Sequence, residues 1–169
     1  MPYYYYILIA VIAMLFIGYL FFYFKYSKKI QEIELFIMDI FLQKLSKIPA
    51  VIEVMRPYVT DQHGAFDPLT HLHSESIIYR YNSIYALMEH NARINDQYNF
   101  LMRLSMAIPD LQKDIYFLYI RDFVMSYDIT MKRELVKFTA FVRIWNRFIF
   151  IKKCTLIWYI LPWREILEI

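Results

Sequence analysis

Four histidines are the residues of this chain best suited to binding a metal ion: His63, His71, His73 and His90. His71 and Glu75 are four residues apart and would share one face of a helix, and His63 follows closely after Asp61. His71 and His73 are two residues apart and would point to different faces of a helix. A zinc site needs three or four converging ligands, and the sequence has neither an H-E-x-x-H motif nor paired C-x-x-C motifs. We therefore predict no metal site and interpret these histidines as surface residues near a loop.

Nucleophilic catalysis has no local signature in this sequence. There is no G-x-S-x-G motif and no glycine-rich loop that could bind a phosphate group. The single cysteine, Cys154, lies in an apolar stretch, where an inert thiol is expected, although Lys152 and Lys153 weakly favour the reactive form. We therefore predict a protein that is not an enzyme, with no catalytic residue, no cofactor and no cofactor-binding residue.

The chain contains one long uncharged segment. Residues 3–24 include no Asp, Glu, Lys, Arg or His. As a helix this segment would be roughly 33 Å long, enough to cross the ~30 Å hydrocarbon core of a bilayer. Aromatic residues at both of its ends are placed like the belts found at membrane interfaces. The segment is too long for a signal peptide and does not end in small residues, so we expect a permanent anchor.

The charges after this segment predict its orientation. Lys25, Lys28 and Lys29 follow it, and nothing comparable precedes it. The positive-inside tendency therefore predicts a single-pass membrane protein with its N terminus outside and its C-terminal part in the cytoplasm. Membrane lipid is then one partner. The net charge of +3 is mild, and no cluster of Lys and Arg beyond these lysines resembles a nucleic-acid footprint, so we expect no nucleic-acid partner.

Composition and spacing predict an all-α fold in three parts. These are an anchor at residues 1–26, a cytoplasmic helical bundle at residues 27–152 and an aromatic tail at residues 153–169. The chain has two glycines where average usage would give about twelve, which is too few for turn-rich β architectures. A single cysteine excludes an internal disulfide framework. In the tail, Trp158, Tyr159 and Trp163 would lie either at a membrane interface or on the end of the bundle.

Apolar residues at steps of three and four predict long helices. The first helix would run from the anchor to Met55, bent at Pro49, and end before the polar residues 60–64. The second would begin at Asp67-Pro68 and continue through Leu104, with residues 91–96 as either a break or a solvated face. The third would restart at Pro109-Asp110, with the acid in its first turn.

The third helix carries the most regular apolar spacing in the chain. Its seam resembles that of a coiled coil and consists of Phe117, Ile120, Val124, Tyr127, Met131, Leu135, Phe138, Val142, Trp145 and Ile149. We expect this seam to be internal core, because a sustained apolar stripe most often packs within its own bundle. The other interpretation is a surface shared with a second copy. Ala10, Ala13 and Gly18 of the anchor do not form a G-x-x-x-G motif, so any self-association would arise mainly in the cytoplasmic helices.

Two blocks of sequence resemble the LemA family. In residues 45–73 the matching positions are Ile48, Pro49, Glu53, Tyr58 and Thr70. In the second block, Pro109, Asp110, Leu111 and Phe117 match, and Phe138 and Trp145-Asn146 fall at the positions of the family's two Tyr-Asn pairs. The resemblance covers roughly residues 5–150. It implies an anchored, cytoplasmic, antiparallel helical bundle, and it offers no established catalytic residues to transfer.

The departures from the family pattern fall mostly at polar positions. Ala50 stands where the family has Asn, Pro57 where it has Gly, residues 61–62 are Asp-Gln instead of His-Glu, and His73 replaces an Arg. Residues 128–131 lack the arginines of the family's last block. The chain therefore resembles a divergent member whose apolar frame is kept.

These observations favour a non-enzymatic, membrane-anchored helical scaffold or adaptor that binds protein partners or assembles with copies of itself at the membrane. The alternative is an envelope protein whose bundle lies outside the cell and binds a ligand or metal near residues 63–73. The side of the membrane on which the bundle lies distinguishes the two.

Overall fold

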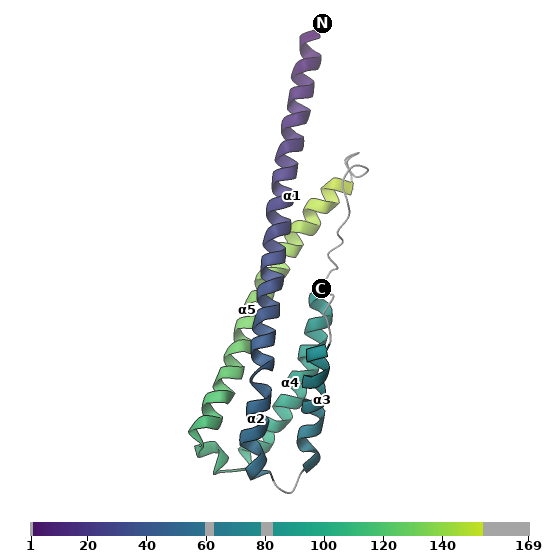
Figure 1. Ribbon diagram of the computed structural model, residues 1–169. Coiled ribbons are helices and arrows are strands. Elements are labelled where there is room, and N and C mark those ends of the chain that lie inside the picture. Colours follow the sequence, from purple (N-terminus) through teal and green to yellow (C-terminus); the bar gives the residue numbers. More distant parts are fainter. Residues whose placement is uncertain (1, 60–62, 79–82, 154–169) are drawn as a thin grey trace. The chain divides into compact units, whose positions relative to one another are not determined.

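The computed structural model describes residues 2–59, 63–78 and 83–153, and all regular structure in these ranges is helical (Figure 1). The α-helices are α1 (Pro2–Leu45), α2 (Ile48–Met55), α3 (Asp67–Ile78), α4 (Ile84–Met106) and α5 (Ile115–Lys153). Three short 3-10 turns, η1 (Arg56–Tyr58), η2 (His63–Phe66) and η3 (Leu111–Lys113), lie between them. The predicted all-α class is confirmed. Cys154 and the three aromatic residues of the tail lie outside the described residues.

The contacts divide the chain into two compact units. The first unit comprises Met1–Leu35 and Val136–Ile169, and its described part consists of the N-terminal portion of α1 and the C-terminal portion of α5. The second unit is Phe36–Leu135 and contains the remaining helices.

The first helix is shorter than its apolar spacing predicts. It ends at Leu45, and a turn at Ser46 and Lys47 leads into α2, which begins at Ile48. Pro49 therefore lies in the first turn of α2 rather than inside a continuous helix. A proline removes its own backbone donor and crowds the carbonyl four residues earlier, here that of Leu45, so the chain stops one helix and starts another. The continuous helix expected through Pro49 is therefore wrong, because a two-residue turn separates α1 from α2, although the backbone of Lys47 in that turn keeps α-helical dihedral angles.

The structure has two helices, α3 and α4, where a single helix is expected over residues 67–104. α3 begins at Asp67, as expected, and ends at Ile78, and α4 starts at Ile84 and packs against α3. Ser83 caps α4, because its hydroxyl accepts a hydrogen bond from the backbone N–H of Ala86 at 3.2 Å. The polar residues 91–96 lie inside α4 and do not break it.

The start of the last helix also differs from the prediction. Pro109 and Asp110 belong to a turn before η3, and α5 begins five residues after Asp110, at Ile115. Asp114 is the capping acid. Its Oδ1 accepts hydrogen bonds from the backbone N–H groups of Tyr116 at 2.8 Å and Phe117 at 3.1 Å. The preference for an acid at a helix start holds, but the residue that satisfies it is Asp114.

The seam of α5 is largely buried. In the second unit Phe117, Ile120, Val124 and Met131 are buried, and Tyr127 and Leu135 are half-buried. In the first unit Phe138, Val142 and Trp145 are buried, and the side chain of Ile149 lies outside the described set. The ring centroids of Trp145 in α5 and Tyr23 in α1 lie 5.1 Å apart. A single chain is enough to bury these residues. This agrees with the expectation that the seam is internal core.

Candidate functional site

The most unusual group of the second unit is the ammonium of Lys44, which is fully buried. Its Nζ donates hydrogen bonds to Oδ1 of Asn91 at 2.9 Å, to Oδ1 of Asp128 at 2.7 Å and to Oδ1 of Asn95. These acceptors come from α4 and α5, so one lysine of α1 joins three helices. An ammonium has three protons, and each has an acceptor here.

Burial and neighbouring charges shift the pKa of Lys44 in opposite directions. Burial lowers the pKa of Lys44, the carboxylate of Asp128 raises it by attraction and hydrogen bonding, and Lys132 lowers it further. A buried cation is tolerated only when it is paired and hydrogen-bonded, as this one is. We call Lys44, Asn91, Asn95 and Asp128 the Lys44 cluster. With its protons engaged, Lys44 has no lone pair for nucleophilic chemistry, so the cluster fixes how α1, α4 and α5 pack.

The sequence contains a partial signal for this cluster. Lys44 stands at the helical spacing of the buried residues Phe41 and Ile48. Asn91 interrupts the buried stripe of α4 between Leu87 and Ile94, and Asp128 lies next to the α5 seam. These three polar residues, one cation and two oxygen-bearing acceptors, stand at or beside core positions, which marks each as a candidate buried group but does not pair them with one another. Each residue alone resembles part of a solvated face, so spacing along the sequence does not identify the cluster.

Tyr98 lies in α4 near the same cluster and is only 3% exposed. Its hydroxyl makes no hydrogen bond within the described part of the chain. Burial raises the pKa of Tyr98 far above its usual range, and the negative charge of Asp128 adds to this effect, while Arg121 opposes it. The hydroxyl is therefore a buried polar group that costs stability.

A serine and a histidine meet in the core between α3 and α4. The Ser76 hydroxyl donates to the carbonyl of Leu72 at 2.6 Å, and Nε2 of His90 lies 2.5 Å from Ser76 Oγ. Because the hydroxyl proton is already directed to Leu72, Nε2 of His90 is assigned as the donor to Ser76. A catalytic serine needs the opposite arrangement, with the imidazole accepting its proton. This pair therefore joins two helices.

Two further histidine side chains are described, those of His71 and His73. His71 is exposed, and His73 is half-buried. Burial lowers the pKa of His73, and a hydrogen bond with the backbone of Leu45 partly offsets this. Within the described ranges, no three residues among His, Cys, Asp and Glu are placed to hold a metal ion. The side chain of His63 and the whole of Asp61 lie outside the described set.

Shallow, open grooves lie beside α3 and α4. One, of about 530 Å³, is lined by η2, α3 and α4 residues that include Pro68, Asp96, Phe100 and Arg103. A second, of about 330 Å³, is lined by residues that include His71, Arg93 and Asp96. Arg93 forms an ion pair with Glu75 at 3.9 Å. These grooves mix both signs of charge and do not gather groups for any one reaction.

The residues on which the expected resemblance to the LemA family rests are scattered along the described helices and turns. Three are buried core residues: Ile48, Leu111 and Phe117. Six lie at the surface of the second unit: Pro49, Glu53, Tyr58, Thr70, Pro109 and Asp110. Asn146 is half-buried in the first unit. The Tyr58 hydroxyl donates to Oδ2 of Asp114 at 3.3 Å, and the Thr70 hydroxyl donates to the Phe66 carbonyl at 2.9 Å, so these polar members make local contacts and no shared site.

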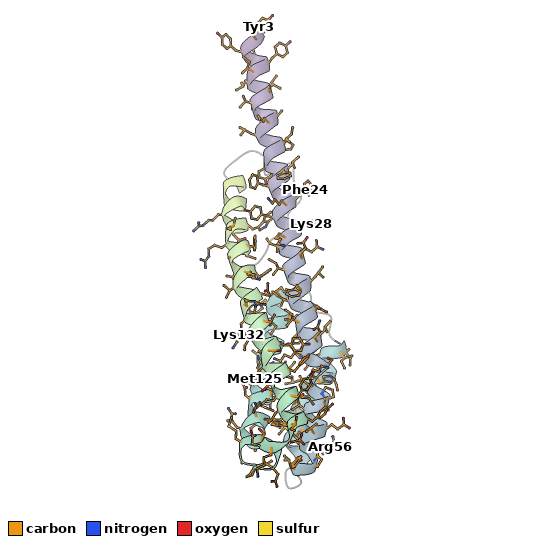
Figure 2. All side chains as sticks on the ribbon, turned by 90° about the vertical axis from the view of Figure 1, so that its left-hand side faces the viewer. Tyr3, Phe24, Lys28, Arg56, Met125 and Lys132 are labelled. Carbon is orange, nitrogen blue, oxygen red and sulfur yellow. The ribbon has the colours of Figure 1, made fainter. Side chains whose placement is uncertain are left out.

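The largest exposed apolar surface of the described residues belongs to α1. Figure 2 shows the side chains from Tyr3 to Phe24 projecting outward around this helix, with Lys28 one turn further on. α1 contains the one described segment that is long and apolar enough to cross a membrane. Comparisons of the chain with protein-family models, with curated proteins and with solved structures found no match. Function is therefore inferred from the residues and their arrangement.

Proposed function

We propose that this protein is a membrane-anchored helical scaffold or adaptor without enzymatic activity. Residues 3–24 of α1 span the bilayer, and the remaining helices pack as an antiparallel bundle in the cytoplasm. One observation carries this proposal. The uncharged segment is a helix whose large apolar side chains are exposed almost throughout, including Tyr3, Ile12, Leu15 and Phe24. A water-soluble protein rarely exposes so large a continuous apolar surface.

The energetics of this segment favour lipid as its surroundings. Moving an exposed Leu, Ile or Phe side chain out of water contributes about 1.5–3 kcal/mol. A helix also satisfies its own backbone donors and acceptors, which is required inside hydrocarbon. Lys25, Lys28 and Lys29 directly follow the apolar segment and are exposed, which supports a cytoplasmic location for the chain beyond them.

The proposal includes divergent membership of the LemA family. It is supported by the burial of Ile48, Leu111 and Phe117, which are apolar matches to the family pattern. The Lys44 cluster adds a reason for a rigid bundle, because buried, hydrogen-bonded charges favour one arrangement of helices over others. A rigid bundle is suited to presenting surfaces to partners.

Protein partners or further copies of this chain are supported by one face of α5. Ile115, Tyr119 and Ile129 are 82%, 64% and 67% exposed. Their spacing places them on the same side of the helix, away from the buried seam. Asp122 and Ser126 are exposed on the same side, so this face is a mixed polar and apolar surface, as the surfaces of non-obligate protein contacts are.

Alkaline extraction of membranes tests the anchor. We expect the full-length protein to stay in the membrane pellet and the variant Ile12→Arg/Leu15→Arg to be released. Each charge near the centre of a spanning helix opposes insertion by about 2.5–3.5 kcal/mol. The matched control is Leu35→Arg/Leu42→Arg, which changes two exposed apolar residues of α1 outside the apolar segment. Equal extraction of both variants, or release of the unmodified protein, would contradict the proposal.

A further inference from the structure

We propose that α1 and α5 together form a collar that binds the anionic headgroups of membrane lipids. The basic collar consists of Lys25 and Lys28 of α1 and Arg143 and Arg147 of α5. This inference rests on the proposed function, because it takes residues 3–24 to be in the bilayer. The inference extends the proposed function in two ways. It names the class of lipid that is bound, and it adds α5 as a second helix that contacts the membrane.

Aromatic contacts within the first unit align the two helices. The rings of Tyr23 and Trp145 lie 5.1 Å apart between centroids, and those of Tyr26 and Phe141 lie 6.3 Å apart. Residue numbers fall along α1 as they rise along α5, so the helices run in opposite directions here. Residues 141–147 of α5 therefore lie beside the end of the apolar segment of α1.

The four basic side chains of the collar are exposed and free to bind a ligand. None of them forms an ion pair with a residue that the structure describes, whereas Lys29 is paired with Glu32 at 3.1 Å. Lys25 and Lys28 follow Phe24 within about 6 Å along the helix axis. Arg143 and Arg147 are four residues apart and lie on one face of α5.

The excess positive charge of the chain is concentrated in the two sequence segments that carry this collar. Residues 1–35 and 136–153 contain eight Lys and Arg against two acids, Glu32 and Glu34. Residues 36–135 contain ten Lys and Arg against twelve acids. The excess positive charge is therefore confined to the segments that adjoin the proposed span. Both acids lie at least one turn beyond Lys28, further from the apolar segment.

The chemistry of these residues fits lipid phosphate. Arginine binds phosphate oxygens with two parallel hydrogen bonds, and lysine supplies a point charge. The tyrosine and tryptophan rings between the charges have the amphipathic character of residues found at headgroup level. A basic cluster next to a spanning helix is typical of binding to anionic lipid. Because the collar is continuous with the apolar segment, lipid headgroups are favoured over a soluble anion or a nucleic acid.

Spin-labelled lipids in nanodiscs test the collar with the full-length protein. The discs contain phosphatidylcholine with one-fifth phosphatidylglycerol, and the measurement is the relative association of labelled phosphatidylglycerol and phosphatidylcholine. We expect the unmodified protein to prefer phosphatidylglycerol. In Arg143→Gln/Arg147→Gln this preference should fall by up to about fivefold for each charge removed, at low ionic strength. Arg143→Lys/Arg147→Lys keeps both charges and should keep most of the preference.

The matched control is Arg103→Gln/Lys113→Gln, which removes two exposed basic residues of the second unit and should leave the preference unchanged. High salt should weaken the preference of the unmodified protein, because it screens exposed charges. Insertion is measured on the same discs by flotation. Failure of the protein to insert would contradict the proposed function. Insertion with no lipid preference, or a preference that survives loss of both arginines, would overturn the collar alone.

Discussion

Replacing Lys44 by methionine should strongly destabilise the second unit. The methionine keeps most of the length of the side chain but removes the ammonium. It leaves the carboxylate of Asp128 and the amides of Asn91 and Asn95 without the donor that now satisfies them. The variant therefore isolates the contribution of one buried charge.

The magnitude follows from the burial of the partners. Removing one member of a buried ion pair costs about 3–5 kcal/mol, because the other charge remains uncompensated. The side chain of Asp128 is 22% exposed and can be partly hydrated, whereas Asn91 is buried. We therefore expect a loss of about 3 kcal/mol, at the lower end of this range. Adding Asp128→Leu to Lys44→Met should restore part of the lost stability, because it removes the unpaired charge.

Urea unfolding of the full-length protein in detergent, followed by helical circular dichroism, measures the effect. The matched control is Lys47→Met. Lys47 is half-buried with its Nζ 5.2 Å from the centre of the Phe123 ring, and its loss should cost about 0.5–1 kcal/mol. If Lys44→Met is no less stable than Lys47→Met, the assignment of Lys44 as a paired core charge is wrong.

Further predictions concern other single residues. Tyr98→Phe removes a buried hydroxyl without a partner and should stabilise the protein by about 1 kcal/mol in urea unfolding. Because the pKa of Tyr98 is raised in the folded state, the protein should also lose stability as the pH rises above 10, and the phenylalanine variant should lose less. The pKa of His73 is lowered, so stability should fall as the pH drops below 6.5, and His73→Gln should flatten that part of the profile. Asp114→Ala should cost about 1 kcal/mol through loss of the α5 cap. Trp145→Ala should cost about 3–5 kcal/mol, whereas an unchanged melting curve with a lost oligomer peak in size-exclusion chromatography would mean that Trp145 faces another copy.

Periodicity predicted the helical class and most of the α5 core. Phe117, Val124 and Trp145 are buried because steps of three and four keep a helix on one apolar face. The spacing of apolar residues is a local pattern that repeats along the chain, so it can be recognised from the sequence alone. The low glycine content excluded turn-rich folds by the same kind of argument.

Helix ends were harder to predict because single residues determine them. A turn before Pro49 separates α1 from α2, Ser83 caps α4, and Asp114 takes the role expected of Asp110. In each case several neighbouring residues could supply the cap or the break. Which one does so depends on packing between helices that are distant in the sequence.

The Lys44 cluster could not be assembled from local pattern alone. Asp128 is 84 residues from Lys44, and Asn91 is 47 residues from it. Each residue is polar and sits in a helix with other polar residues, so local spacing permits a solvated position. Their meeting is a consequence of how α1, α4 and α5 pack, which the sequence does not specify residue by residue.

The side of the membrane that carries the bundle tests the central claim most directly. In a Cys154→Ser background, the exposed Ser126 of α5 is replaced by cysteine, and a second variant carries Tyr3→Cys. Both are treated with a membrane-impermeant maleimide in intact cells and after lysis. A membrane-anchored cytoplasmic bundle predicts labelling of Tyr3→Cys in intact cells and of Ser126→Cys only after lysis. Labelling of Ser126→Cys in intact cells would contradict the account and favour an external bundle.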